Sequence, residues 1–275
     1  MTDPARPAPG PSKTAGEAVD RVSALVDCLL DPLKGCPWDR EQTLYSLTED
    51  LLEEMYELRE AMRLDQAGGV LEEGGDLGFI LVFLAKLAEK KWSFGLKEML
   101  DGAADKMVYR HPHVFGQKAG IDSSSDVLDL WHRLKRRKRG GVLESVPEAM
   151  PALARCHRLS AKAARAGFDW PEVREVRAAL DRELNELDEE MEKGDFKDPQ
   201  RAGRLKHELG DVLMAAANLA RHLGFSGEKA LNEANDRFVS RFSYMEKKLA
   251  ENNRKPEEAG LEELERLWQE AKSSI

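Results

Sequence analysis

Cysteine is scarce in this sequence, and the few cysteines form no known motif. Cys28, Cys36 and Cys156 are an odd set without a C-x-x-C pair. This argues against a disulfide framework and a zinc knuckle, because both need cysteines at paired spacings. Free thiols persist in reducing compartments, and we therefore expect a cytoplasmic protein.

Long hydrophobic runs are also lacking. The run Phe79–Leu87 is interrupted by Lys86 and soon reaches Glu89, whereas a membrane-spanning helix needs about 18 consecutive apolar residues. Residues 1–14 contain four prolines and no apolar segment of the signal-peptide type. The sequence thus predicts no membrane partner and a flexible tail over residues 1–16.

Positive charge is in the minority. The 275 residues include 42 Lys and Arg against 51 Asp and Glu, which gives a net charge of −9. An acidic chain is a poor match for nucleic acid, and we expect no nucleic-acid partner. With 41% hydrophobic and 34% charged residues, the chain has enough apolar material for a folded core.

Strand-like alternation is rare, and helical periodicity runs from about Glu17 onward. Leu51, Met55 and Leu58 follow one another at steps of four and three residues, as on one face of a helix. A similar stripe begins at Leu77 and again at Leu209. The predicted fold class is all-α.

The strongest pattern is an internal repeat. Five motifs occur twice, in the same order and 129 to 137 residues apart, so we predict a tandem repeat of one helical-bundle module. The predicted boundaries are a tail at 1–16, a first repeat at 17–139, a linker at 140–152 and a second repeat at 153–275. The repeated motifs are Gly35–Trp38 and Gly167–Trp170, Glu54/Glu57 and Glu183/Glu186, Glu73/Asp76 and Glu208/Asp211, Asp105–Arg110 and Asp236–Arg241, and Leu130–Lys135 and Leu267–Lys272.

Carboxylates are concentrated beside the apolar stripes. Glu54 and Glu57 share a helical face, as do Glu73 and Asp76, because each pair is three residues apart. The four converge if their helices form a hairpin across Gly68–Gly69. Two like charges about 4 Å apart repel by about 4 kcal/mol at an effective dielectric constant of about 20. Such a cluster is therefore splayed into solvent, partly protonated or neutralised by a cation.

The ligand chemistry restricts the cation. Oxygen ligands without cysteine or histidine favour Mg²⁺, with Mn²⁺ as the alternative. A ferritin-like di-iron site is disfavoured because it requires Glu-x-x-His on two helices, and this sequence contains no Glu-x-x-His.

The ordered composite of motifs resembles a known family. Glu53-Glu54-x-x-Glu57 followed by Glu73-x-x-Asp76 resembles the EExxE…ExxD signature of MazG-type nucleoside triphosphate pyrophosphohydrolases. Residues 35–43, 110–116, 167–170, 208–211 and 218–224 are similar to tandem-domain bacterial members. The resemblance implies an all-α fold, Mg²⁺-dependent conversion of NTP to NMP and pyrophosphate, and a homodimer.

The resemblance also implies the catalytic and metal-binding carboxylates. The leading glutamate of EExxE is Glu53 in the first repeat but Arg182 in the second, which leaves the water positioning or outer charge of that site in doubt. The carboxylates matched to the family are Glu54, Glu57, Glu73, Asp76, Glu183, Glu186, Glu208 and Asp211.

Other residues could bind the substrate. Pairs of cations one helical turn apart could hold a polyphosphate, and the alternative is ordinary surface charge. Two tryptophans could stack on a base, and the alternative is core packing; packing is favoured for Trp38 and Trp170. The candidates are Lys106, Arg110, Arg204, Arg237 and Arg241 for phosphate, and Trp131 and Trp268 for the base.

Two other functions remain open at this point. A duplicated module could be a catalytically silent interaction domain, although retention of all eight carboxylates weighs against this. It could also be a nucleotide sensor that turns over slowly. The base preference and the more active repeat do not follow from the sequence.

Overall fold

A computed structural model describes residues 11–116, 123, 126–127, 130–131, 141–193 and 198–274. Over this part of the chain the secondary structure is helical and no strand occurs, which confirms the all-α class. The chain forms two compact units, Met1–Arg137 and Lys138–Ile275. None of the described helices has the length and apolar character needed to cross a membrane.

Most of the predicted tail, residues 1–10, lies outside the described residues, and the first helix begins at Ala15. The predicted linker at 140–152 reaches the start of a helix at Ala152, and its extent stays a prediction.

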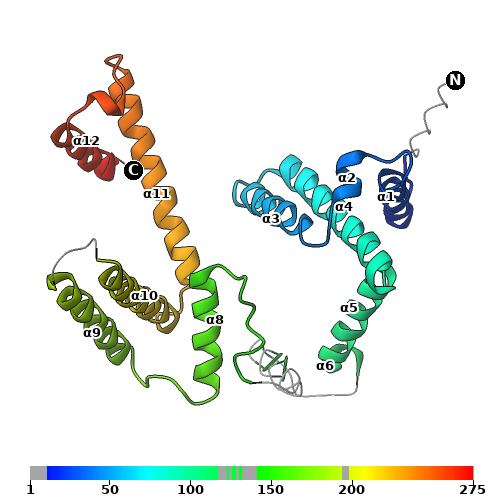
Figure 1. Ribbon diagram of the computed structural model, residues 1–275, viewed down its shortest axis with the longest axis horizontal. Coiled ribbons are helices and arrows are strands. Elements are labelled where there is room, and N and C mark those ends of the chain that lie inside the picture. The colour runs from blue at the N-terminus through cyan, green and yellow to red at the C-terminus, as the bar shows by residue number, and fades with distance from the viewer. Residues whose placement is uncertain are drawn as a thin grey trace. The chain divides into compact units, whose positions relative to one another are not determined.

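The first unit is built around two paired helices, α3 and α4 (Figure 1). Helix α4 also contacts α1 and α5 and so lies at the centre of the unit. The helices are α1 (Ala15–Leu29), α2 (Pro37–Glu41), α3 (Leu47–Arg63), α4 (Ala67–Trp92), α5 (Leu96–Arg110) and α6 (Pro112–Phe115).

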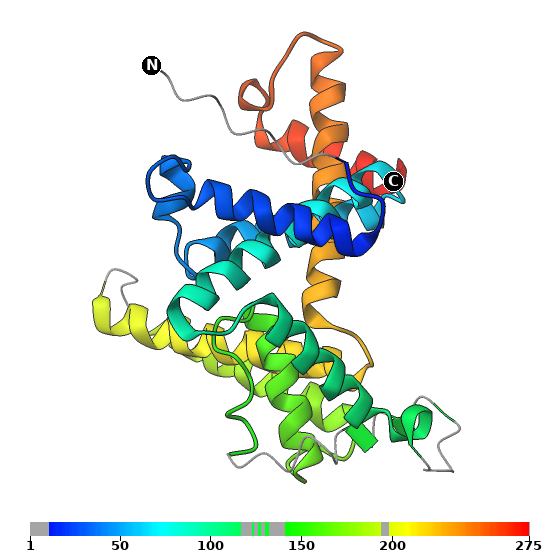
Figure 2. The ribbon, with the colours of Figure 1, turned by 90° about the vertical axis from the view of Figure 1, so that its right-hand side faces the viewer.

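The second unit repeats this order. Helix α9 pairs with α10, α8 packs against α10 and α11, and α12 packs against α11. Figure 2 shows α11 as a long helix that projects from the α8–α10 group. The elements are α8 (Ala152–Arg165), α9 (Val173–Glu192), α10 (Pro199–His222), α11 (Gly227–Ala250), the 3-10 helix η1 (Pro256–Glu258) and α12 (Leu261–Ser274).

The turn between α3 and α4 differs from the expected one. Asp65, with φ of 54°, closes the turn in the left-handed region that Asp tolerates. The glycines expected in the loop lie instead in the first turn of α4. A Cβ on Gly69 would lie 2.9 Å from Cβ of Ala61 on α3. Glycine is therefore needed here for close packing of the two helices.

The open end of the α9–α10 pair is held by a buried arginine. Arg201 is 1% exposed and donates hydrogen bonds to the carbonyls of Glu190 and Met191, at the end of α9. The last carbonyls of a helix lack the usual partners four residues on. The Glu190 carbonyl also accepts a hydrogen bond from the Lys193 N–H at 3.3 Å, and the arginine adds further donors at this helix end. The pairing fixes the position of α10 along α9.

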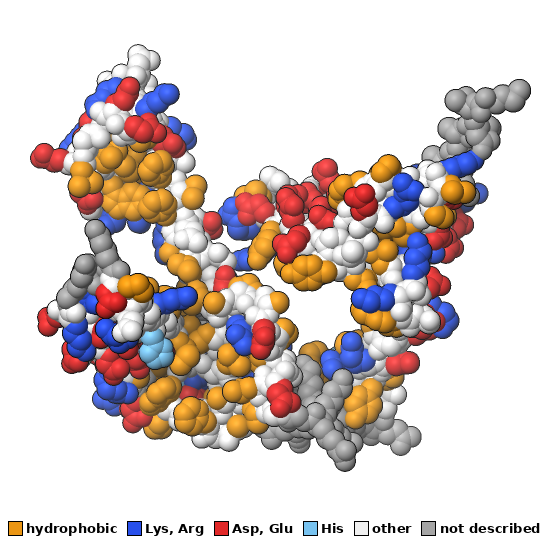
Figure 3. Space-filling model, in the orientation of Figure 1, with side chains coloured by type: hydrophobic (Ala, Val, Ile, Leu, Met, Phe, Trp, Pro, Cys, Tyr) orange, Lys and Arg blue, Asp and Glu red, His pale blue; other side chains and the backbone are white. Residues whose placement is uncertain are grey.

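The two units bury their hydrophobic residues differently. In the first unit, Leu47, Phe83 and Ile80 belong to one core cluster. In the second unit, a cluster between α11 and α12 contains Met245, Leu249 and Leu267. Large apolar side chains on α11 and α12 remain exposed, and Figure 3 shows hydrophobic surface over these helices at the upper left.

We predict that Leu47→Ala lowers the free energy of unfolding of the first unit by about 2–5 kcal/mol, because it removes a side chain that is 2% exposed. Urea unfolding followed by circular dichroism measures this change. The matched control is Leu33→Ala, since Leu33 is 89% exposed and its truncation should cost less than about 0.5 kcal/mol. Equal effects of the two substitutions would contradict the assigned core.

Candidate active site

Three glutamates converge on the inner faces of α3 and α4. Glu54 and Glu57 come from α3 and Glu73 from α4, and one carboxylate oxygen of each lies within 4.8 Å of the others. Glu54 and Glu73 are half-buried, whereas Glu57 is exposed. We call these residues the first acidic trio.

The fourth predicted carboxylate of the first unit, Asp76, lies one turn beyond Glu73 on α4 and is exposed. Burial raises the pKa of Glu54, and the charge of Asp76 and a hydrogen bond with Glu73 raise it further. Burial and the charge of Glu57 raise the pKa of Glu73. Asp76 is therefore close enough to disfavour the ionised form of Glu54.

The second unit forms the same cluster. Glu183 and Glu186 on α9 and Glu208 on α10 each place a carboxylate oxygen within 4.8 Å of the others, and we call them the second acidic trio. Burial raises the pKa of Glu183, followed by the charges of Glu186 and Asp211. In both repeats the structure thus brings together three of the four predicted carboxylates, from separate helices, whereas Asp76 and Asp211 lie outside the trios.

Arg182 replaces the leading glutamate of the signature in the second repeat. It is exposed on α9, and its charge partly offsets the effects that raise the pKa of Glu183. The substitution therefore weakens the repulsion in the second acidic trio without altering its geometry.

The predicted phosphate-binding cations lie on other helices. Lys106 and Arg110 are on α5, and Arg237 and Arg241 are on α11. Within the described residues, no hydrogen bond or ion pair joins any of these four to an acidic trio. Their role in binding phosphate stays a prediction.

Arg204 has a partner of its own. Its Nε donates to a carboxylate oxygen of Glu190 at 2.7 Å, and Glu190 is 6% exposed. The hydrogen bond from Arg204 is the main reason that the pKa of Glu190 is lowered. Arg204 itself is exposed, but its hydrogen bond to a buried carboxylate favours a structural role at the end of the α9–α10 pair.

The two candidate base-stacking tryptophans both pack within their units. The indole N–H of Trp131 donates to the Arg110 carbonyl at 3.0 Å, and its ring meets the His111 ring edge-on. Trp268 packs beside the Phe238 ring at 5.2 Å between centroids, and the Arg241 guanidinium lies over its face. Packing accounts for both positions, and stacking on a base stays a prediction.

A cavity of about 180 Å³ adjoins the second acidic trio. Sequence reasoning did not find it, because its walls come from three helices and a turn. Two of its lining residues, Glu183 and Asp211, are predicted metal ligands. Its other lining residues include aromatic and amide side chains, namely Phe168, Trp170 and Asn218, together with aliphatic and charged ones.

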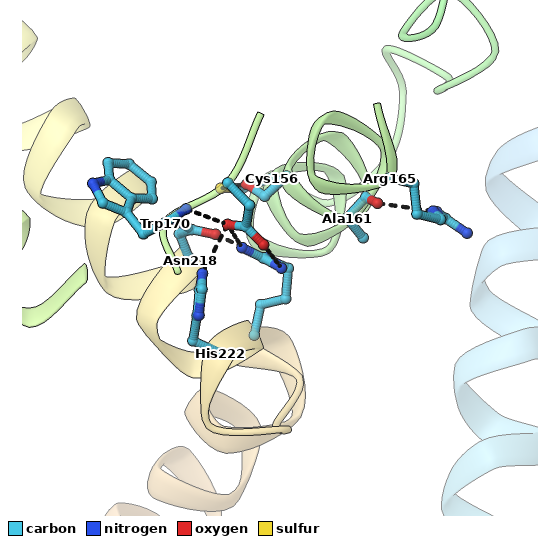
Figure 4. Close-up of polar contacts among 9 residues, drawn as sticks. Cys156, Ala161, Arg165, Trp170, Asn218 and His222 are labelled. Atoms are coloured by element: carbon cyan, nitrogen blue, oxygen red, sulfur yellow. Dashed lines mark hydrogen bonds and ion pairs between the residues drawn. The ribbon is translucent and has the colours of Figure 1, made fainter. Parts of the chain in front are cut away.

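An ion-paired cluster fixes one wall of this cavity (Figure 4). Arg221 donates two hydrogen bonds to the Asp169 carboxylate, at 3.0 and 2.5 Å, and His222 Nε2 lies 2.8 Å from the same group. Partial burial raises the pKa of Asp169, but hydrogen bonds from Arg221 and His222 outweigh it and lower the pKa overall. The backbone N–H of Trp170 also donates to Asp169 at 3.0 Å, so the cluster anchors the turn that carries Trp170.

Comparison with known proteins finds the same domain twice in the chain. The model of the MazG nucleotide pyrophosphohydrolase domain matches residues 42–115 and 172–245. The chain belongs to the MazG family. Both acidic trios lie within the matched segments, whereas Trp131, Trp170 and Trp268 lie outside them.

Curated MazG relatives align with nearly the whole chain. The Nucleoside triphosphate pyrophosphohydrolase of Escherichia coli (strain K12) is 35% identical over 259 residues, which cover 92% of this chain and 97% of that protein. The Nucleoside triphosphate pyrophosphohydrolase/pyrophosphatase MazG of Thermotoga maritima is 34% identical over 260 residues, which cover 94% and 98%. These matches confirm the family resemblance of the motifs.

We predict that Glu183→Gln raises the melting temperature of the metal-free protein at pH 8. The folded-state pKa of Glu183 lies above its ordinary value of 4.5. Between these two pKa values the folded protein binds more protons than the unfolded chain, so it loses stability as the pH rises through the raised pKa. The amide carries no charge and avoids this loss. Below pH 4.5 the difference between variant and native protein should disappear.

The same variant tests cation binding. Mg²⁺ should raise the melting temperature of the native protein more than that of Glu183→Gln, because the variant has lost one ligand charge. Glu189→Gln on the same helix is the control, since Glu189 is exposed and outside the trio. Equal Mg²⁺ responses in all three proteins would contradict a metal centre at the second acidic trio.

Proposed function

We propose that this MazG-family chain is a Mg²⁺-dependent nucleoside triphosphate pyrophosphohydrolase. It converts NTP and dNTP to NMP or dNMP and pyrophosphate, and so helps to clear unwanted nucleotides from the pool. The observation that carries the proposal is the convergence of three glutamates from two helices, found in both units. The curated relatives named as pyrophosphohydrolases support the same reaction.

The acidic trios fit a hard divalent cation. Their ligand atoms are all carboxylate oxygens within 4.8 Å of one another. Burial first, and then the charges of neighbouring carboxylates, raise the pKa of Glu54 and of Glu183, and a cation would relieve the repulsion between these charges. Oxygen ligands suit Mg²⁺, with Mn²⁺ as the alternative. When bound, the ion supplies charge neutralisation between carboxylates and phosphate and an acidified water.

The residues of the chain then have separable roles. The carboxylates that hold the cation are Glu54, Glu57, Glu73 and Asp76 in the first unit and Glu183, Glu186, Glu208 and Asp211 in the second. Attack by water oxygen on the α-phosphorus breaks the bond to the bridging oxygen, and pyrophosphate leaves. No covalent nucleophile is required. Cations one turn apart on α5 and α11 neutralise the leaving pyrophosphate.

We also propose that the enzyme works as a homodimer in the cytoplasm. Phe238 and Val239 on α11 are 56% and 61% exposed, and neighbouring apolar side chains left in water are typical of a surface that binds a partner. A second copy of the chain would cover these residues and would bring further cations toward the acidic trios. No disulfide joins the three cysteines, all of which lie in the described part of the chain, in keeping with a reducing compartment.

We expect purified protein with Mg²⁺ to release pyrophosphate and NMP from a mixture of NTPs between pH 7 and 10. Anion-exchange chromatography of the products distinguishes this cleavage from release of NDP and phosphate. Glu54→Ala combined with Glu183→Ala should abolish the reaction, because each acidic trio loses a ligand.

Two other outcomes would contradict this activity. Absence of any cleavage and of nucleotide binding would identify a silent interaction module. Tight nucleotide binding with negligible NMP formation in a single turnover would identify a sensor.

We expect Arg237→Ala to raise the KM for NTP about tenfold, because a charge-assisted hydrogen bond to phosphate is lost. Steady-state kinetics with inorganic pyrophosphate as the measured product tests this. Lys247→Ala is the control, since it removes a positive charge from an exposed position on the same helix. If both variants raise KM equally, Arg237 acts only through net charge.

A further inference from the structure

The cavity of the second unit has a polar wall whose orientation is fixed. Asn218 lines the cavity and is 6% exposed. Its Oδ1 accepts a hydrogen bond from Arg221 Nε at 2.8 Å. An arginine side chain has only donors, so this contact sets which end of the amide faces Arg221. The amide nitrogen, Nδ2, takes no part in this contact.

The Nδ2 group of Asn218 has no acceptor among the described residues. This nitrogen is not among the fully buried side-chain atoms that lack a partner, so it is accessible, and water or a ligand in the cavity can supply an acceptor. Asp169 holds Arg221 by two hydrogen bonds, and Arg221 is 14% exposed. The amide is therefore held ready to donate and is prevented from turning its oxygen toward a ligand.

The distance along α10 between Asp211 and Asn218 matches the length of a nucleotide. Asn218 follows Asp211 by seven residues, which is about 10 Å of helix rise. Phosphate groups at the second acidic trio would leave the base at the Asn218 end of the cavity, beside Trp170. The base edge farthest from the ribose then meets the amide nitrogen.

The first unit has no amide at this position. With the offset of 135 between the two ExxD motifs, Asn218 corresponds to Phe83 and Met214 to Phe79. Phe83 is 1% exposed and belongs to the core cluster, with its ring 6.0 Å from that of Phe79. Lys86 stands in place of Arg221 and pairs with Asp27 at 2.8 Å. Hydrophobic packing thus replaces the polar wall in this repeat.

We infer that Asn218 is a specificity-determining residue of the second repeat, which donates a hydrogen bond to an oxo group on the nucleobase. This rests on the proposed pyrophosphohydrolase activity. Arg221 and Asp169 are positioning residues, because they act through the amide of Asn218. Trp170 supplies an aromatic surface on which any base can stack, so the amide provides the discrimination.

The chemistry of the bases makes the inference specific. Adenine and cytosine carry an amino donor where hypoxanthine, guanine and uracil carry an oxo acceptor. The fixed amide donor of Asn218 favours bases that carry the oxo group. With an amino-bearing base, two donors would face each other without an acceptor. The favoured substrates therefore include the triphosphates of deaminated bases, which differ from the parent nucleotides at this position.

The test compares substrates that differ at this group. We expect native protein with Mg²⁺ to show kcat/KM about tenfold higher for ITP than for ATP, and for UTP than for CTP. Asn218→Asp keeps the shape but replaces the donor with an acceptor, and both ratios should fall to one or below. Asn252→Asp adds the same charge in an exposed turn, and the native ratios should persist.

A second variant tests the positioning role. Arg221→Lys keeps a positive charge near Asp169 but cannot contact both Asp169 and Asn218 with a planar fork. Both ratios should decrease in this variant, while total pyrophosphate release from a saturating NTP mixture falls less than the ratios do. A role confined to stability would lower the rates for all four substrates equally.

The outcomes separate this inference from the proposed function. No pyrophosphate release from any of the four substrates would overturn the enzyme itself. Release with native ratios near one, or with ratios unchanged in Asn218→Asp, would overturn the role of Asn218 alone. The native ratios decide the question even if Asn218→Asp does not fold.

Discussion

Mutual repulsion among half-buried carboxylates is the constraint on which both units depend. Each helix pair holds three glutamate oxygens within 4.8 Å of one another, and burial together with the neighbouring carboxylates raises the pKa of Glu54 and of Glu183. Packing near the turn holds each helix pair together in spite of this repulsion. In one unit Gly69 packs closely against Ala61, and in the other Arg201 donates a hydrogen bond to the end of α9. A divalent cation bound by these carboxylates would neutralise their charges and so remove the repulsion.

The two repeats have kept this acidic geometry while their surroundings have diverged. In the first unit, Phe83 fills the space beside the acidic helices and joins the hydrophobic core. In the second, Asn218 lines a cavity, and the ion pair of Asp169 with Arg221 holds it in place. In the proposed reaction the carboxylates hold the cation in both repeats, and we infer that only the repeat with a cavity beside them distinguishes the base.

Much of the fold follows from the sequence alone. The helical periodicity and the order of the repeats were predicted from spacing and are found in the structure, and three of the four predicted carboxylates in each repeat lie together. The turn at Gly68–Gly69 was predicted wrongly, because glycine also serves close helix packing and Asp65 can close a turn. Arg204 was predicted to bind phosphate, and its pairing with Glu190 depends on where α9 ends.

The sequence by itself determined the helical class, the duplication and the family, since these depend on periodicity and on motifs repeated in order. Which side chains meet across helices was decided only by the tertiary structure. Asp169 and Arg221 are 52 residues apart, and no spacing rule connects a turn with the last turn of a distant helix. Their contact arises from the packing of α8, α9 and α10, and with it the cavity and the fixed amide of Asn218.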